Sequence, residues 1–442
     1  MRRYIAVMII FVALAAGCIG RGVLGGPVCA YAQMESFSVA SPPNPVGSGA
    51  RAMGVGGAFV AVADDATAAS WNPGGLPQLQ KPEVSVVYAL ERRRETRSSL
   101  SLPDLEGEET TTLSNLNYLS MVYPFGLARR NMVFSLNYQR LYDFDREFTM
   151  CLSDGSIEAF QADGTLYTVS PALAMQATED LFVGLTINIW SDSWTGMSDW
   201  ENNYSLIIDP NHIYTAKESY RNFRGVNANL GFLYRVNPRW TIGMVYKTPF
   251  RARLDYGYYN KSTPEETENP AYGMIESMDF PPALALGVSC RISDAWTFSA
   301  DVTRRDWDEL VWRNTRGQSY GLFTRFDPNN NLNPVDFPHI DPTYSLRMGV
   351  EYLKILEKTV IPFRGGIFYD PVPSVGSPHS EYGMSLGSGI SLGDLIVDFA
   401  YQYRVRLDVP GTETGLAEKS WGHLVYEDKT QHMFLLSAIY HF

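Results

Sequence analysis

The sequence has little that could cross a membrane as a helix. After the N-terminal leader, no stretch approaches the roughly 20 consecutive apolar residues that a membrane-spanning helix needs, although 45% of the 442 residues are hydrophobic. The apolar residues must therefore serve other elements. A chain of this length allows two or three soluble domains or one large barrel.

Cysteine and histidine are scarce. Two of the four cysteines lie in the leader, and Cys151 and Cys290 stand far apart without zinc-ligand spacing. The six histidines are scattered, and no Gly-x-Ser-x-Gly motif is followed by a predicted helix. We therefore predict no metal site, no cofactor and no enzymatic activity. Cys290 shares an apolar strand face with Leu284, Leu286 and Val288, which predicts an inert wall residue.

Positive charge is also in short supply, because the formal net charge is −12. This acidity disfavours nucleic-acid binding. The first 32 residues resemble a signal peptide, with Arg2 and Arg3 before an apolar stretch and a small-residue cleavage site that ends at Ala32. A lipoprotein signal ending at Cys18 is the alternative, and either reading predicts export. The predicted organisation is a signal peptide over 1–32, an N-terminal plug over 33–82 and a barrel over 83–442.

Aromatic residues are abundant at 13% of the chain, and apolar residues alternate with polar ones from residue 83 onward. The alternation predicts strands with one apolar and one polar face. Fourteen candidate strands lie near 83–94, 110–124, 131–142, 165–178, 180–193, 220–235, 239–256, 280–293, 295–308, 344–354, 359–370, 380–391, 394–404 and 431–442.

The connections between these strands alternate between long loops and short turns. The long loops are expected at 95–109, 143–164, 194–219, 257–279, 309–343, 371–379 and 405–430. Such a rhythm is typical of an outer-membrane barrel. We therefore predict an all-β protein, a 14-stranded antiparallel transmembrane β-barrel with an N-terminal plug that contains short helices. Oxygen-rich residues around 327–336 could bind calcium weakly, although turn chemistry explains them equally well.

The polar faces of the strands should point into the barrel and the apolar faces to lipid. Five charged residues fall on polar faces and are predicted to line the lumen: Asp301, Arg347, Glu351, Arg364 and Asp398. The last strand carries an apolar face that includes Tyr440 and Phe442. It resembles the terminal recognition strand of outer-membrane barrels, which implies the barrel assembly machinery as a partner.

Residues 33–82 do not alternate and contain a short helix signal that is abruptly broken. Asp64 or Asp65 could cap a helix ending at Trp71, and "NPGG" from Asn72 then stops it. Fourteen strands enclose more space than wall side chains fill. A compact segment that turns sharply could therefore close the barrel from inside, and we call this plug the hatch.

The stretch "GARAMGVGGAFVAVADDATAASWNPGGL", residues 49–76, resembles the N-terminal signature of the FadL/TodX superfamily of outer-membrane transporters, which includes PorV-like barrels. The matching positions include Arg51, Gly54, Gly56, Gly57, Asp64, Asp65, Asn72 and Pro73. Gly74 stands where the signature usually has alanine.

The resemblance implies passive uptake of a hydrophobic compound, with long-chain fatty acids as the leading substrate. The compound would pass from the outer loops through the lumen to a lateral opening beside the hatch, and Asn72, Pro73 and Gly74 would form the gate. It also implies a monomer among the lipids of the outer membrane of a Gram-negative-type bacterium. The alternative is a PorV-like barrel that binds or shuttles secreted proteins.

Overall fold

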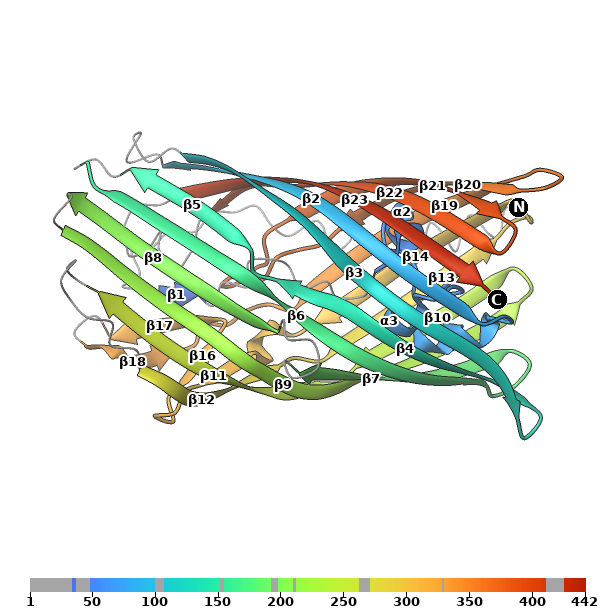
Figure 1. Ribbon diagram of the computed structural model, residues 1–442, viewed down its shortest axis with the longest axis horizontal. Helices are drawn as coiled ribbons and strands as arrows, with labels where there is room; N and C mark the ends of the chain where they lie inside the picture. Colours follow the sequence, from blue (N-terminus) through green and yellow to red (C-terminus); the bar gives the residue numbers. More distant parts are fainter. Residues whose placement is uncertain are drawn as a thin grey trace. The chain divides into compact units, whose positions relative to one another are not determined.

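The strands of the chain close into a single antiparallel barrel with fourteen strand positions (Figure 1). Among the described residues, no helix is long and apolar enough to cross a membrane. The computed structural model describes residues 34–36, 48–99, 107–151, 155–191, 198–209, 212–261, 271–327, 330–410 and 425–442.

Four of the strand positions consist of two consecutive strands each: β4 with β5, β7 with β8, β10 with β11, and β12 with β13. The strands of this barrel sheet are β2 (Glu83–Ser99), β3 (Gly107–Leu127), β4 (Arg130–Asp143), β5 (Arg146–Cys151), β6 (Ile157–Gln176), β7 (Leu181–Ser191), β8 (Asp199–Asp209), β9 (His212–Asn237), β10 (Trp240–Lys247), β11 (Phe250–Lys261), β12 (Ala271–Phe280), β13 (Ala283–Arg291), β14 (Trp296–Arg305), β15 (Val311–Arg313), β16 (Ser319–Gly321), β19 (Thr343–Ile355), β20 (Val360–Tyr369), β21 (Glu381–Leu392), β22 (Leu395–Pro410) and β23 (Val425–His441).

The barrel closes where the first strand meets the last. β2 pairs with β23 in unbroken register from Glu83 opposite His441 to Ser99 opposite Val425. Short turns join the strands at one end of the barrel, such as the two-residue turn at Ala128 and Arg129, where both residues have positive φ. We call this the turn end and the opposite end the loop end.

The fourteen-stranded barrel predicted from the sequence is confirmed, but several predicted loops are wrong. The segments 143–164, 194–219 and 257–279 contain β5, β8 and β12, which extend the sheet toward the loop end. The segment 309–343 contains β15 and β16, as well as β17 (Phe323–Asp327) and β18 (Asn330–Asp336), which form a separate sheet with β1 (Met34–Ser36). Beyond the lipid both faces of a strand can be polar, so the alternation that reveals a strand is lost there.

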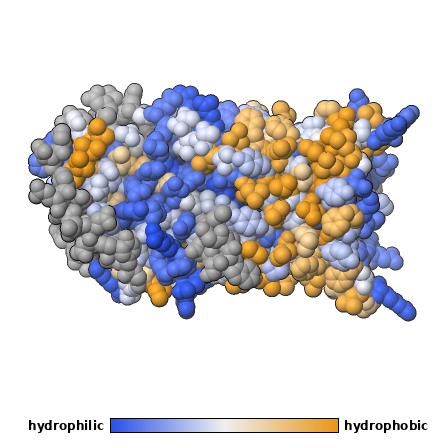
Figure 2. Space-filling view, viewed as in Figure 1, coloured by the Kyte–Doolittle hydropathy of each residue, from blue (hydrophilic) through white to orange (hydrophobic). Residues whose placement is uncertain are grey.

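The two faces of the wall differ as the alternation requires. On β2, Val84, Val86 and Leu90 are exposed outward, whereas Ser85 and Val87 are fully buried against the interior. Figure 2 shows the apolar outer surface gathered toward the turn end, with polar surface on both sides of it. This apolar band is the part of the wall that lipid covers.

The hatch lies inside the barrel, at the level of the apolar band. It contains α2 (Ala50–Gly54), α3 (Ala68–Trp71) and the 3-10 helix η1 (Pro73–Gln78). Its apolar side chains, including those of Phe59, Trp71 and Leu76, are at most 1% exposed. Helices this short are not stable alone in water, so packing against the wall must hold the segment together.

Candidate functional site

The break after α3 is built around one asparagine. Asn72 is fully buried, and its backbone is extended, which ends the helix. Its side-chain oxygen accepts a hydrogen bond from the Gly74 N–H at 3.0 Å, while Pro73 has no N–H to satisfy. Asn72 therefore caps η1 and reverses the chain within two residues.

The same asparagine ties the hatch to the wall. Its Nδ2 donates to the Val60 carbonyl at 2.7 Å within the hatch and to the Phe232 carbonyl at 3.0 Å on β9. The proposed gate residues lie against Gly184 of β7 and Gly231 of β9. A Cβ at Gly231 would stand 2.3 Å from the Asn72 side-chain oxygen, and one at Gly184 would stand 2.3 Å from the Pro73 carbonyl. Only glycine permits this close approach.

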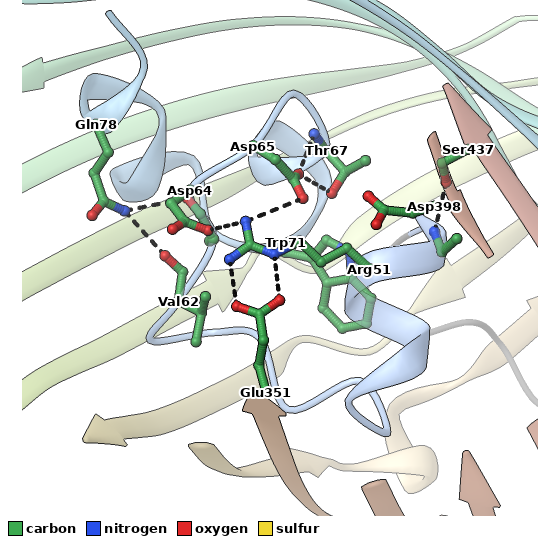
Figure 3. A network of polar contacts seen from close by, with 12 residues as sticks. Arg51, Val62, Asp64, Asp65, Thr67, Trp71, Gln78, Glu351, Asp398 and Ser437 are labelled. Atoms are coloured by element: carbon green, nitrogen blue, oxygen red, sulfur yellow. Dashed lines mark hydrogen bonds and ion pairs between the residues drawn. The ribbon is translucent and has the colours of Figure 1, made fainter. Parts of the chain in front are cut away.

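Arg51 forms the centre of a polar network between hatch and wall (Figure 3). Its guanidinium donates to both Glu351 carboxylate oxygens, at 3.1 and 3.2 Å, and to Asp64 at 2.6 Å. Asp65 lies 4.0 Å away and accepts the Thr67 N–H at 2.8 Å, directly before α3. Because α3 begins at Ala68, it is shorter than the sequence suggests.

Burial alone would lower the pKa of Arg51, but the carboxylates of Asp64, Glu351 and Asp65 outweigh it and raise that pKa well above its usual value. Burial also raises the pKa of Asp65, although the neighbouring Arg51 opposes this shift. Arg51 thus holds a fixed positive charge that joins three carboxylates.

The predicted lumenal charges all lie buried inside the barrel. Glu351 also accepts a hydrogen bond from Arg364 at 2.6 Å, and Arg364 donates to Asp398 at 2.5 Å. Asp301 accepts the Val60 N–H of the hatch at 2.8 Å. Arg347 contacts the Gly56 carbonyl at 3.4 Å and pairs with Asp370 at 3.0 Å.

The glycines of the hatch motif serve packing and turns. Gly56 and Gly57 have positive φ values of 71° and 76°, which side-chain-bearing residues rarely adopt. Gly54 packs against Gly387 of β21, where an added Cβ would be 2.9 Å from the Gly54 Cα. This Gly-rich run follows the helix α2 rather than a strand, so it lacks the strand-to-helix setting of a phosphate-binding loop.

A large aromatic cluster lines the lumen on the loop-end side of the hatch. Most of its rings come from β4, β7, β8, β9, β11, β12 and β15. Trp200 stacks on Tyr220 at a centroid distance of 4.4 Å, and Phe250 stacks on Phe280 at 4.7 Å. From the sequence, apolar residues in or beside the loop at 309–343, such as Trp307, Trp312 and Phe323, are candidates for a landing site for greasy ligands or for loop-packing anchors. The rings on the strands do not stand out, since each strand contributes only one or two.

Two lumenal cations lie at the edge of the aromatic cluster. Lys247 and Arg305 both occupy positions opposite Ala283, one on each side, and all three face the lumen. The Arg305 guanidinium lies 5.1 Å from the centre of the Trp307 ring. Within the described part of the chain, neither cation forms an ion pair with a carboxylate. The sequence does not single out either cation, although both sit on the polar face of a predicted strand.

The opposite half of the lumenal wall carries charges that are paired. Arg146 bonds Glu95 and Glu427 at 3.1 and 2.7 Å, and Arg404 bonds Asp370 and Glu381 at 3.0 and 2.7 Å. The lumen is therefore divided into an aromatic half with two unpaired cations and a half whose charges neutralise each other.

The ladders of the wall are not equally complete. Beside Asn72, β7 and β9 pair without interruption from Leu181 to Ser191. By contrast, the ladder between β3 and β4 ends at Tyr118 opposite Gln139, although β3 continues to Gly107. The Tyr118 hydroxyl donates to the Ala66 carbonyl of the hatch at 3.1 Å, so this ladder ends beside the hatch.

The remaining predicted features are placed as follows. Tyr440 and Phe442 are more than half exposed on the outside of β23 and beyond it. Cys290 is a free thiol, half-buried in the wall. In the ranges that the structure describes, no three potential ligand side chains group to hold a metal ion.

The closed barrel, its apolar outer band and its internal hatch define the class of the protein as an outer-membrane β-barrel channel. The profile of the outer membrane protein transport family (OMPP1/FadL/TodX) matches residues 31–442, and the chain belongs to this family. Members of the family are transport channels for hydrophobic compounds.

Solved structures share the fold at low sequence identity. A FadL homologue of Pseudomonas aeruginosa is 14% identical, with a TM-score of 0.65, 90% of this chain covered and 99% of that one. The toluene transporter TodX of P. putida is 12% identical, with a TM-score of 0.60 and the same coverage. The toluene transporter TbuX of Ralstonia pickettii is 15% identical, with a TM-score of 0.53, again covering 90% and 99%. Among curated proteins, no sequence matches significantly.

The close fit between hatch and wall predicts the effect of one added methyl group. In Gly231→Ala the new Cβ overlaps Asn72, so the hatch must shift, at a cost of about 1–3 kcal/mol. We expect a several-fold increase in ion conductance across planar bilayers. Gly365→Ala is the matched control, because its nearest neighbours stand 3.9 Å away. Equal conductance of the two variants would show that this close fit between hatch and wall does not limit ion flow.

Proposed function

We propose that this protein is a passive channel for long-chain fatty acids, without catalysis or energy coupling. The loop end faces the outside of the cell and the turn end faces the periplasm. Acids enter from the loop end, bind in the lumen above the hatch and leave sideways into lipid. The proposal refines the family's transport of hydrophobic compounds to one class of substrate.

The observation that carries this proposal is the pair of unpaired cations next to an apolar wall. A fatty acid needs a cationic partner for its carboxylate and apolar surface for its chain, which gains about 0.8 kcal/mol per buried CH₂. Lys247 and Arg305 supply the first, and the adjoining aromatic cluster supplies the second. An uncharged hydrocarbon would gain nothing from two buried cations, whose desolvation is costly.

The cations stand close to the hatch but not on it. Gly243, four residues before Lys247 on β10, approaches the Val60 carbonyl of the hatch. Four strand residues span about 13 Å. An acid held at Lys247 and Arg305 would therefore have its carboxylate above the hatch and its chain among the aromatic rings.

The proposed exit lies where the ladder between β3 and β4 ends beside Ala66. The 3-10 helix η1, which Asn72 caps, packs against β4, β6, β7 and β9. It therefore contacts both the uninterrupted ladder between β7 and β9 and the strand β4, where the ladder to β3 ends. A shift of Asn72 would move the hatch away from β4. The substrate would then pass from aromatic wall to lipid without crossing water.

Removing both cations tests the substrate class. In Lys247→Ala with Arg305→Ala, saturable uptake of labelled oleate should fall by about a hundredfold or more, since each of the two charge-assisted hydrogen bonds contributes about 1.5–3 kcal/mol. Uptake of labelled toluene should stay unchanged, because it has no carboxylate. The thermal unfolding midpoint should not fall, because the double variant breaks no ion pair.

Arg304→Ala is the matched control for this experiment, since Arg304 is the outward-facing neighbour of Arg305 and pairs with Asp306. Its oleate uptake should equal that of the wild type. Unchanged oleate uptake in the double variant would contradict fatty-acid selection by these cations.

Removing the hatch anchor tests the exit. Asn72→Ala with Pro73→Ala abolishes three hydrogen bonds and frees the turn, so directed oleate uptake into proteoliposomes should fall about fivefold. Wild-type rates in this variant would remove Asn72 and Pro73 from the gate. Background uptake by both proteins would instead favour the PorV-like role of binding secreted proteins.

The same proposal includes two partners of the barrel itself. The outward apolar side chains of Tyr440 and Phe442 suit recognition of the last strand by the barrel assembly machinery. A barrel that closes within one chain, through the pairing of β2 with β23, fits a monomer surrounded by outer-membrane lipids.

A further inference from the structure

The outer wall carries a charge arrangement that lumenal transport does not use. Arg224 of β9 and Arg253 of β11 stand directly opposite each other across the ladder. Both point away from the lumen, because their neighbours Phe223, Ala252 and Leu254 are fully buried inside. Two exposed arginines thus lie side by side on the outside of the barrel.

These two like charges lack internal compensation. Like charges directly opposite each other destabilise a sheet, and neither arginine forms an ion pair with any described residue. Their cross-strand neighbours on the far sides are hydroxyls, Ser191 opposite Arg224 and Ser277 opposite Arg253. By contrast, the nearby Arg251 is already paired with Asp279. Across the neighbouring strands, the outer wall therefore presents two guanidinium groups without an ion-pair partner, flanked by serines.

The depth of the pair in the wall indicates what lies against it. Val226, the next outward residue of β9 toward the turn end, is 58% exposed, and Leu230, Phe232 and Tyr234 continue the apolar face. Arg224 is the first charged outward residue beyond this face. Figure 2 shows polar surface beyond the loop-end border of the apolar band. With the loop end outward, as in the proposed function, the headgroups of the outer leaflet occupy this depth.

We propose that Arg224 and Arg253 bind a phosphate of lipid A in the outer leaflet. A guanidinium matches two phosphate oxygens with parallel hydrogen bonds, and serine hydroxyls can donate to the remaining oxygens. The protein as a whole carries a net charge of −12, which repels anionic headgroups. A local pair of free arginines is what such a wall needs to hold an anionic lipid in one place.

The test is lipid retention by the full chain in detergent, measured by native mass spectrometry with added bisphosphorylated lipid A. In Arg224→Ser with Arg253→Ser, the fraction of lipid-bound protein should fall about tenfold. Arg224→Lys with Arg253→Lys should lose less, since the charges remain. Raised salt should weaken retention by the wild type.

The matched control is Arg92→Ser with Arg94→Ser, which removes the same charge from the outer face of β2. Retention in this control should change less than twofold, and an equal loss in both double variants would overturn the site. Phosphatidylglycerol should be retained equally by wild type and Arg224/Arg253 variant. If its retention falls as steeply as that of lipid A, the pair is a general phosphate contact and the assignment to lipid A is wrong.

Discussion

Hydrogen bonds between lumenal side chains and the backbone of the hatch are the interaction on which the rest of the structure depends. A segment with helices of four to six residues leaves many of its own N–H and C=O groups unpaired. The wall supplies the missing partners, from Asp301 to the Val60 N–H, from Ser437 to the Ala50 N–H and from Gln402 to the Met53 carbonyl. Glycines of the wall bring the two backbones close enough for these contacts. The hatch is folded because it is enclosed.

This constraint explains why the lumen is divided. Side chains at hatch level must be polar, because each unpaired backbone group inside the barrel would be costly. On the loop-end side of the hatch, the lumenal side chains no longer need to be polar. There, one half of the wall is aromatic, and the charges of the other half neutralise each other in pairs. Buried ion pairs contribute little net stability compared with apolar packing, so the paired half is better understood as wall that repels a greasy solute. Under the proposed function, the substrate would follow the aromatic half.

The sequence predicts the strands within the lipid band well, because lipid on one side and polar lumen on the other enforce strict alternation. It predicts less outside the band. β8 and β12 lie in segments that the sequence predicts as loops, since strands that meet water on one face and lumen on the other need not alternate in hydropathy. The contacts between the aromatic rings on the strands also cannot be predicted from the sequence, because Trp190, Phe223 and Phe280 are far apart in sequence and meet only when the barrel closes.

In the hatch, the sequence predicts the local turn but not the wall residues that it contacts. The turn at Asn72 follows directly from Pro73 and the glycines around it, and the sequence indicates that the chain reverses there. The partners of Asn72 do not follow, because Phe232 lies 160 residues away on β9. Similarly, Arg51 belongs to a recognisable motif, but its bond to Glu351 of β19 depends on how the hatch is seated.

Hydrogen exchange of the hatch amides in the full-length protein, embedded in lipid nanodiscs, tests the central claim most directly. Amides that are bonded to the wall, such as those of Ala50 and Val60, should exchange as slowly as strand amides at the same depth. Complete exchange of residues 48–79 within seconds, with the strands still protected, would show that the hatch is not held by the wall and would contradict the account.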